Sequence, residues 1–190
     1  MRQLFVALSL LTLISSTGTA QREESGGREE FSAVALSTGG VLTNPVAAQL
    51  EIDIERWSTA EQRQRLVGTL GKGQRAMLDV LRDLPRVGSI RTPGQLGLSL
   101  HYAHQTPGPD GGRQIFLATD RPIGFAEEWY SSRTVEYPFT FIELNLSNRG
   151  EGTGRLSIAA RVRASRDGRF VYVENWDTAP INLTQVKRRR

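Results

Sequence analysis

The sequence lacks cysteine, and it has only two histidines and two methionines among 190 residues. The absence of cysteine excludes a disulfide framework and any cysteine-based zinc site. The fold must therefore be held by a hydrophobic core, and a chain of this length can bury one.

Long apolar runs are also scarce, and the one present stands at the N-terminus. Arg2 is followed by an apolar run from Leu4 to Ile14 and then by small and polar residues ending at Ala20. This order is typical of a secretory signal peptide, and the run is shorter than the ~20 residues of a membrane-spanning helix. We expect residues 1–20 to be removed after Ala20, leaving a secreted or periplasmic protein without a transmembrane segment. A lipoprotein signal is excluded because no cysteine is available.

No strong excess of one charge is present. The 24 Lys and Arg residues face 20 Asp and Glu residues, for a net charge of +4, and the two signs are interspersed. A nucleic-acid partner is therefore not indicated. The exception is a basic tail at 187–190, where a weak contact with an anionic surface and a solvated end are both open. The tail consists of Lys187, Arg188, Arg189 and Arg190.

Composition divides the remaining chain into a leader and one domain. Residues 21–30 are charged and carry no apolar side chain, which predicts a disordered leader. Residues 31–186 are expected to form a single domain. Within it, a capping box beginning at Ser58 and two apolar patterns at helical spacing predict a helical hairpin over 58–84.

Strict alternation elsewhere predicts β-strands. In the most regular stretch, 155–164, Leu156, Ile158, Ala160 and Val162 are expected on one buried face. The Asp167-Gly168 turn that follows predicts a hairpin. Further strands are expected near 31–36, 46–57, 87–91, 96–105, 113–119, 139–146, 170–174 and 181–186. Strands and helices do not alternate, so we predict a mainly β (α+β) fold: an antiparallel β-sandwich or barrel of about eight to nine strands with a two-helix hairpin insertion.

The two histidines fall on one predicted strand. His101 and His104 are three residues apart, so they should point to opposite faces and cannot share a metal ion. His104 falls on the side of Leu98, Leu100 and Tyr102, where a hydrogen-bonded core role is the expectation. Tyr102 and His104 are also candidate binding residues. No metal and no cofactor are predicted.

Carboxylates give a second set of candidates. Glu51, Asp53 and Glu55 lie about 7 Å apart along one strand face, which is too wide for a calcium loop. Cross-strand pairing with Arg155, Arg161 and Arg163 is the expectation. The sequence contains no Gly-x-Ser-x-Gly, phosphate-loop or His-Glu-x-x-His motif, and no catalytic residue is assigned.

The irregular 120–130 segment carries the most suggestive cluster. Two carboxylates and two aromatic side chains in a loop resemble the rim of a sugar-binding site or glycosidase. A flap packed over the end of the sheet is the alternative. The candidate binding residues are Glu127, Glu128, Trp129 and Tyr130.

Several short phrases resemble an uncharacterised family of secreted bacterial proteins, a domain of unknown function. They include Arg56-Trp57-Ser58, Ile90-Arg91-Thr92-Pro93-Gly94, Thr119-Asp120-Arg121-Pro122-Ile123, Tyr137-Pro138-Phe139-Thr140 and Gly150-Glu151-Gly152. These are turns and strand starts. The resemblance implies an exported bacterial domain and transfers no site.

The leading functional expectation is an exported non-enzymatic domain that binds a ligand or an envelope component. A small apolar molecule inside the barrel is one form of it. Such a cavity, or a filled core in its place, would be lined by Leu98, Leu100, Tyr102, Ile142, Leu144, Ile158 and Val162. The alternatives are a glycan-acting hydrolase or carbohydrate-binding module using 120–130, and an interaction subunit using a sheet edge or the helix pair.

Overall fold

The computed structural model describes residues 6–8, 27–37, 46–121, 136–164, 171–175 and 179–189. The first six strands are β1 (Val6–Leu8), β2 (Glu29–Ser37), β3 (Val46–Ile54), β4 (Gly88–Arg91), β5 (Leu98–Leu100) and β6 (Tyr102–Pro107). The other five are β7 (Arg113–Thr119), β8 (Phe139–Leu146), β9 (Glu151–Ala164), β10 (Val171–Asn175) and β11 (Ile181–Arg188). The helices are α1 (Ala60–Val67) and α2 (Gln74–Asp83), with a 3₁₀ turn at Pro109–Gly111.

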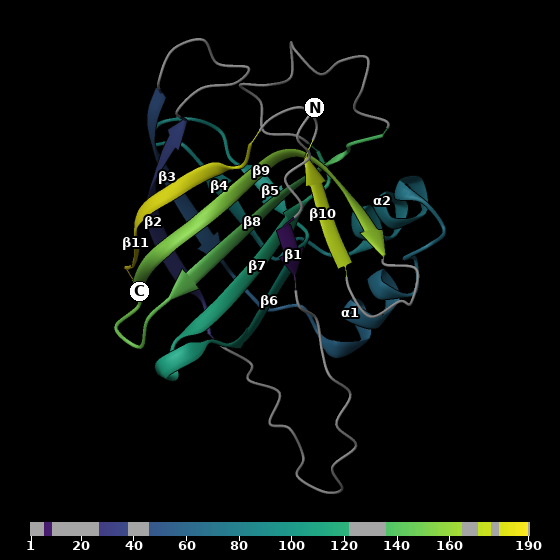
Figure 1. The fold of residues 1–190 in the computed structure, drawn as a ribbon, viewed down its shortest axis with the longest axis horizontal. Helices are drawn as coiled ribbons and strands as arrows, with labels where there is room; N and C mark the ends of the chain where they lie inside the picture. Colours follow the sequence, from purple (N-terminus) through teal and green to yellow (C-terminus); the bar gives the residue numbers. More distant parts are fainter. Residues whose placement is uncertain are drawn as a thin grey trace, which may run out of the picture.

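Nine antiparallel strands form a nearly closed barrel in the order β5-β4-β3-β2-β11-β9-β8-β7-β6 (Figure 1). The strands at the two ends of this order, β5 and β6, are consecutive in the chain and are separated only by His101. The barrel therefore closes through one bent strand, which pairs with β4 before the bend and with β7 after it. Outside this path, β10 pairs with the second half of β9, and β1 pairs with β10.

The interior of the barrel is filled by aliphatic side chains. Ile54, Ile115, Ile142, Leu144 and Leu156 are all completely buried there. They come from four strands, β3, β7, β8 and β9, and β3 is not a neighbour of the other three in the sheet, so burial of this cluster holds the barrel together. The predicted fold class is confirmed, in its barrel form.

Strand β7 is buried on both faces. Ile115 and Leu117 point into the barrel, whereas Phe116 and Ala118 lie on the outer face. The helices cover that outer face beside β6 to β9 (Figure 1). A second core cluster lies beneath them and consists of Leu81, Leu84, Tyr102, Ala118, Phe139, Phe141, Ala160 and Val162.

The single buried face predicted for 155–164 is wrong. Phe141 pairs with Ser157, but Phe139 pairs with Ala160, so β9 holds one extra residue at this point. Such a bulge reverses the facing of every residue beyond it. Leu156 consequently lies inside the barrel, while Ala160 and Val162 lie in the outer cluster.

A second reversal occurs at His101. Leu100 belongs to the interior cluster, yet Tyr102 belongs to the outer one and Ala103 returns to the interior. The shared face predicted for Leu98, Leu100, Tyr102 and His104 is therefore wrong, because the strand bends where it changes partners. His104 lies on the outer side with Tyr102 and lines the pocket described below.

Element boundaries shift slightly from those expected. β2 begins at Glu29, inside the stretch predicted as leader, and β11 runs through Arg188, inside the predicted basic tail. The capping box lies one residue later than predicted. Thr59 Oγ1 accepts a hydrogen bond from the Gln62 amide (3.2 Å), and the Gln62 side chain accepts one from the Thr59 amide (3.0 Å).

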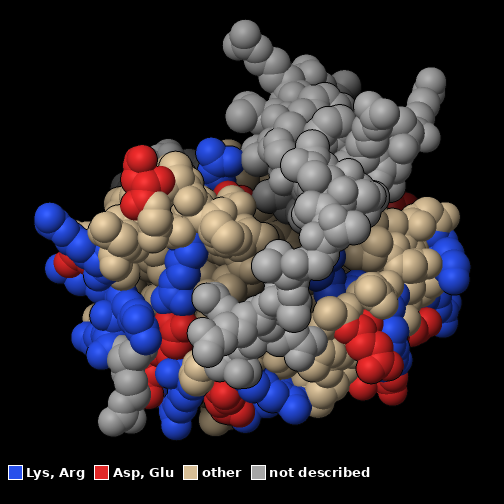
Figure 2. Space-filling model, turned by 90° about the horizontal axis from the view of Figure 1, so that it is seen from below, with Lys and Arg blue, Asp and Glu red and all other residues tan. Residues whose placement is uncertain are grey.

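The acidic stripe on β3 is neutralised, but not by the arginines expected. Glu51 pairs with Arg91 at 2.8 Å, Asp53 with Arg28 at 2.8 Å, and Glu55 with Arg86 at 2.9 Å. Arg161 and Arg163 instead pair with Glu174 across the β9–β10 hairpin. On the face shown in Figure 2, charges of both signs lie side by side.

A more buried ion cluster links Glu29, at the start of β2, to one arginine on β7 and another on β11. Glu29, only 6 % exposed, accepts a hydrogen bond from Arg113 on β7 at 2.8 Å and lies 3.1 Å from Arg188 on β11. Arg113 also donates to Gln105 and stacks over the Phe31 ring. Removing Arg113 takes away two hydrogen bonds to Glu29 and leaves its buried carboxylate with the half-exposed Arg188 as its ion-pair partner among the described residues.

We expect Arg113→Met to lower the free energy of unfolding by about 3 kcal/mol. The matched change Arg91→Met, in an exposed pair with Glu51, should cost less than about 1 kcal/mol. Urea denaturation of both variants measures the difference. Equal losses would show that the Glu29 cluster contributes no more than a surface ion pair.

Candidate functional site

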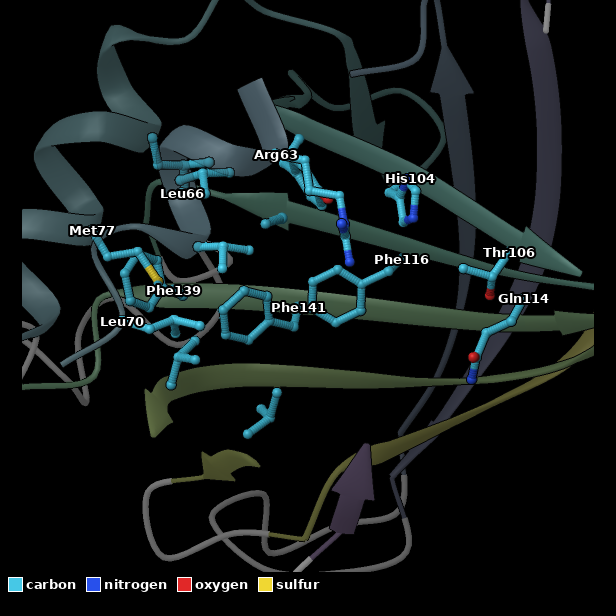
Figure 3. A pocket seen from close by; sticks show the side chains of 16 residues that line it. Arg63, Leu66, Leu70, Met77, His104, Thr106, Gln114, Phe116, Phe139 and Phe141 are labelled. Atoms are coloured by element: carbon cyan, nitrogen blue, oxygen red, sulfur yellow. The ribbon is translucent and has the colours of Figure 1, made fainter. Parts of the chain in front are cut away.

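A pocket of about 140 Å³ lies between the helices and the outer face of the barrel (Figure 3). Its floor is formed by β6, β7, β8 and the second half of β9, with Val173 of β10 at one side. Its roof is formed by α1, α2 and Leu70 between them. The lining residues are Arg63, Leu66, Val67, Leu70, Met77, Leu81, Tyr102, His104, Thr106, Gln114, Phe116, Ala118, Phe139, Phe141, Val162 and Val173.

The roof is attached to the barrel at three places. Before α1, Ser58 exchanges two hydrogen bonds with the Ala103 backbone of β6. At the start of α2, the Gln74 side chain donates to the Val162 carbonyl and accepts from the Val162 amide. After α2, the Leu84 carbonyl lies 3.1 Å from His101 Nδ1.

These attachments satisfy strand edges that would otherwise lack partners. Gln74 pairs with Val162 of β9 just beyond the reach of β8, because β8 begins at Phe139, which pairs with Ala160. Ser58 likewise supplies hydrogen-bond partners to the Ala103 backbone of β6. The helices are thereby fixed over the sheet at their ends, and the space under their middle is only partly filled.

The floor of the pocket is a row of aromatic rings. The Phe116 and Phe141 rings stack with centroids 5.2 Å apart, and Phe139 lies 5.4 Å beyond Phe141. Tyr102 meets the edge of Phe116 at 6.4 Å. Flat rings of this kind bury a large apolar area with little conformational entropy cost, and they favour planar or thin apolar ligands.

Polar side chains gather at one part of the pocket. In Figure 3, Arg63 extends from α1 toward Phe116, with His104, Thr106 and Gln114 farther along the floor. Burial raises the pKa of the Tyr102 hydroxyl to about 12, although the nearby Arg63 charge and hydrogen bond act in the opposite direction. Burial and, secondarily, Arg63 lower the pKa of His104. At neutral pH both groups are therefore uncharged beside a permanent cation.

The predicted candidates have different outcomes. Tyr102 and His104 both line the pocket, although outside the barrel rather than inside it. Leu100, Ile142 and Leu144 pack in the filled interior. The remaining candidates, Glu127, Glu128, Trp129 and Tyr130, lie outside the described residues, so the glycan site stays a prediction.

In the part of the chain that the structure describes, no three His, Asp or Glu side chains are grouped so that they could bind a metal ion. Neither α1 nor α2 is long and apolar enough to cross a membrane.

Sequence reasoning missed the aromatic floor and Arg63. The strands expected near 113–119 and 139–146 contain Phe116, Phe139 and Phe141, but the sequence does not indicate that these rings adjoin. The available signal was a strand apolar on both faces, which requires a cover on each side. The adjacent amphipathic helices are the only helical cover in the described part of the chain.

Comparisons of the chain with protein-family models, with curated proteins and with solved structures give no match. The fold and the pocket geometry are therefore the basis of the functional proposal.

The lowered pKa of His104 gives a testable pH dependence. The unfolded chain takes up a proton near pH 6.5 more readily than the folded chain, so stability should fall as pH drops through 6.5 toward the folded-state pKa. His104→Gln should remove this part of the fall. Urea denaturation at about pH 7.5 and about pH 5 measures it. An unchanged pH dependence in the variant would assign the effect to other groups.

Proposed function

We propose that this protein is a non-enzymatic binding domain that holds a small apolar molecule between its helical hairpin and the outer face of its barrel. The observation that carries the proposal is the pocket of about 140 Å³ with its stacked aromatic floor. An apolar cavity of similar volume, about 150 Å³, is sufficient to bind benzene. The expected ligand is thus about the size of one ring or a short alkyl chain.

Two features support binding rather than simple packing. The floor rings and the roof side chains Leu66, Leu70 and Met77 belong to the same outer cluster, yet they leave a space between them. Interiors are ordinarily close-packed, and an unfilled apolar space forgoes dispersion contacts that a ligand would restore. The barrel interior, in contrast, is occupied by fully buried side chains.

The expected export fits this proposal but rests on the N-terminal sequence pattern alone. Cleavage after Ala20 would also remove β1, which pairs with β10 through Val6, Ala7 and Leu8. β10 carries Val173, one of the pocket residues. A mature protein beginning at Gln21 would therefore present its ligand pocket beside β10, which would keep its pairing with β9 and lose its pairing with β1.

Filling the pocket tests the proposal. We expect indole, a small neutral aromatic probe, to shift the backbone NMR signals of Tyr102, Phe116 and Phe141. Val173→Phe should weaken this binding about tenfold, because it displaces about two methylene equivalents of ligand contact at ~0.8 kcal/mol each.

The matched control is Val34→Phe, which enlarges a half-buried valine on the outer face of β2, away from the pocket. It should leave indole binding unchanged. The proposal fails if indole produces no shifts at the pocket, or if both variants weaken binding equally. If indole binds as expected, native mass spectrometry of protein purified from its own host identifies the natural occupant.

A further inference from the structure

Among the described residues, Arg63 is the one Lys or Arg side chain that lines the apolar pocket. It is half-buried, and it forms no ion pair with any carboxylate of the described residues. Arg63 acts electrostatically on Tyr102 and His104, neither of which supplies a negative charge. A guanidinium placed against apolar surface without an anion is unfavourable, since partial desolvation weakens its hydration.

The neighbouring arginine shows that this arrangement is specific to the pocket side of α1. Arg65, two residues farther along the same helix, points away and pairs with Asp83 of α2. Glu143 of β8, which contacts the pocket residue Gln114, accepts a hydrogen bond from it at 2.7 Å and stands opposite Arg155 on β9. It is therefore engaged elsewhere, and within the described ranges no carboxylate compensates Arg63.

We infer that the ligand of this pocket is an amphiphilic carboxylate, with its apolar part on the aromatic floor and its carboxylate on Arg63. This inference rests on the proposed function and names the chemical class of the ligand. A carboxylate accepts two parallel hydrogen bonds from a guanidinium, which matches charge and geometry together. The Tyr102 hydroxyl stays protonated at neutral pH and adds a further donor at the same place.

The pocket's volume limits the apolar part. A space of about 140 Å³ over the Phe116 and Phe141 rings accommodates one aromatic ring or a short chain. Arg63 extends over the same floor in Figure 3, so the carboxylate must be separated from that ring by only a short linker. Phenylacetate has this form, and phenylacetamide is its uncharged counterpart of nearly equal shape.

The test compares these two probes by NMR titration of the full mature chain. Phenylacetate should bind about tenfold more tightly than phenylacetamide, because a hydrogen bond to a charged group contributes roughly that factor. Arg63→Gln should abolish the preference and leave phenylacetamide binding unchanged. Arg63→Lys should retain part of the preference, since it keeps the charge without the planar fork.

The matched control is Arg75→Gln, which removes an exposed arginine of α2 that does not line the pocket. It should preserve the preference for phenylacetate. If phenylacetamide binds as well as phenylacetate, or if Arg63→Gln keeps the preference or loses both probes, the inference is overturned while the proposed pocket stands. If neither probe binds the unaltered protein, the proposed function fails and the inference fails with it.

Discussion

Apolar side chains on both faces of one wall of the barrel determine the rest of this structure. β7 places Ile115 and Leu117 inside and Phe116 and Ala118 outside, and its neighbours β6 and β8 repeat the pattern with Tyr102 and Phe141. A sheet with one solvent-exposed face needs no second layer on that face, but this wall is apolar on both faces and needs one. The helical hairpin supplies it, and every feature of the pocket follows from how that hairpin is attached.

The attachment explains why the cover is incomplete. Ser58, Gln74 and Leu84 fix the ends of the hairpin to strand edges and to the bend, so hydrogen-bond geometry rather than side-chain packing sets the height of the helices. The side chains between the helices and the sheet do not fill the space, and the pocket remains. Arg63 then brings a charge into the pocket that packing leaves open, and it connects the fold to the proposed recognition of a carboxylate.

Much of the fold was predictable because local patterns survive in the structure. The strands 113–119 and 139–146, the helical hairpin and the mainly β class all follow from periodicity. The reversals at His101 and between Ser157 and Ala160 were not predictable, because a bend or bulge depends on which strand lies alongside. Those two reversals move Tyr102, His104, Ala160 and Val162 out of the interior, so the error in facing and the error in locating the ligand site have the same origin. Arg63 was not predicted as a pocket residue, because its position over the aromatic floor depends on the hydrogen bonds that Ser58, Gln74 and Leu84 form with distant parts of the chain.

The bend at His101 has a topological consequence. In most closed sheets the first and last strands meet only through hydrogen bonds, and the seam between them can open and close again. Here the strands at the two ends of the order are successive lengths of one polypeptide, so the seam contains a covalent linkage. The circumference is consequently fixed by the chain itself. Breathing motions of this barrel have to occur between other strand pairs, and the wall that carries the pocket is tied to the end of the sheet that cannot separate.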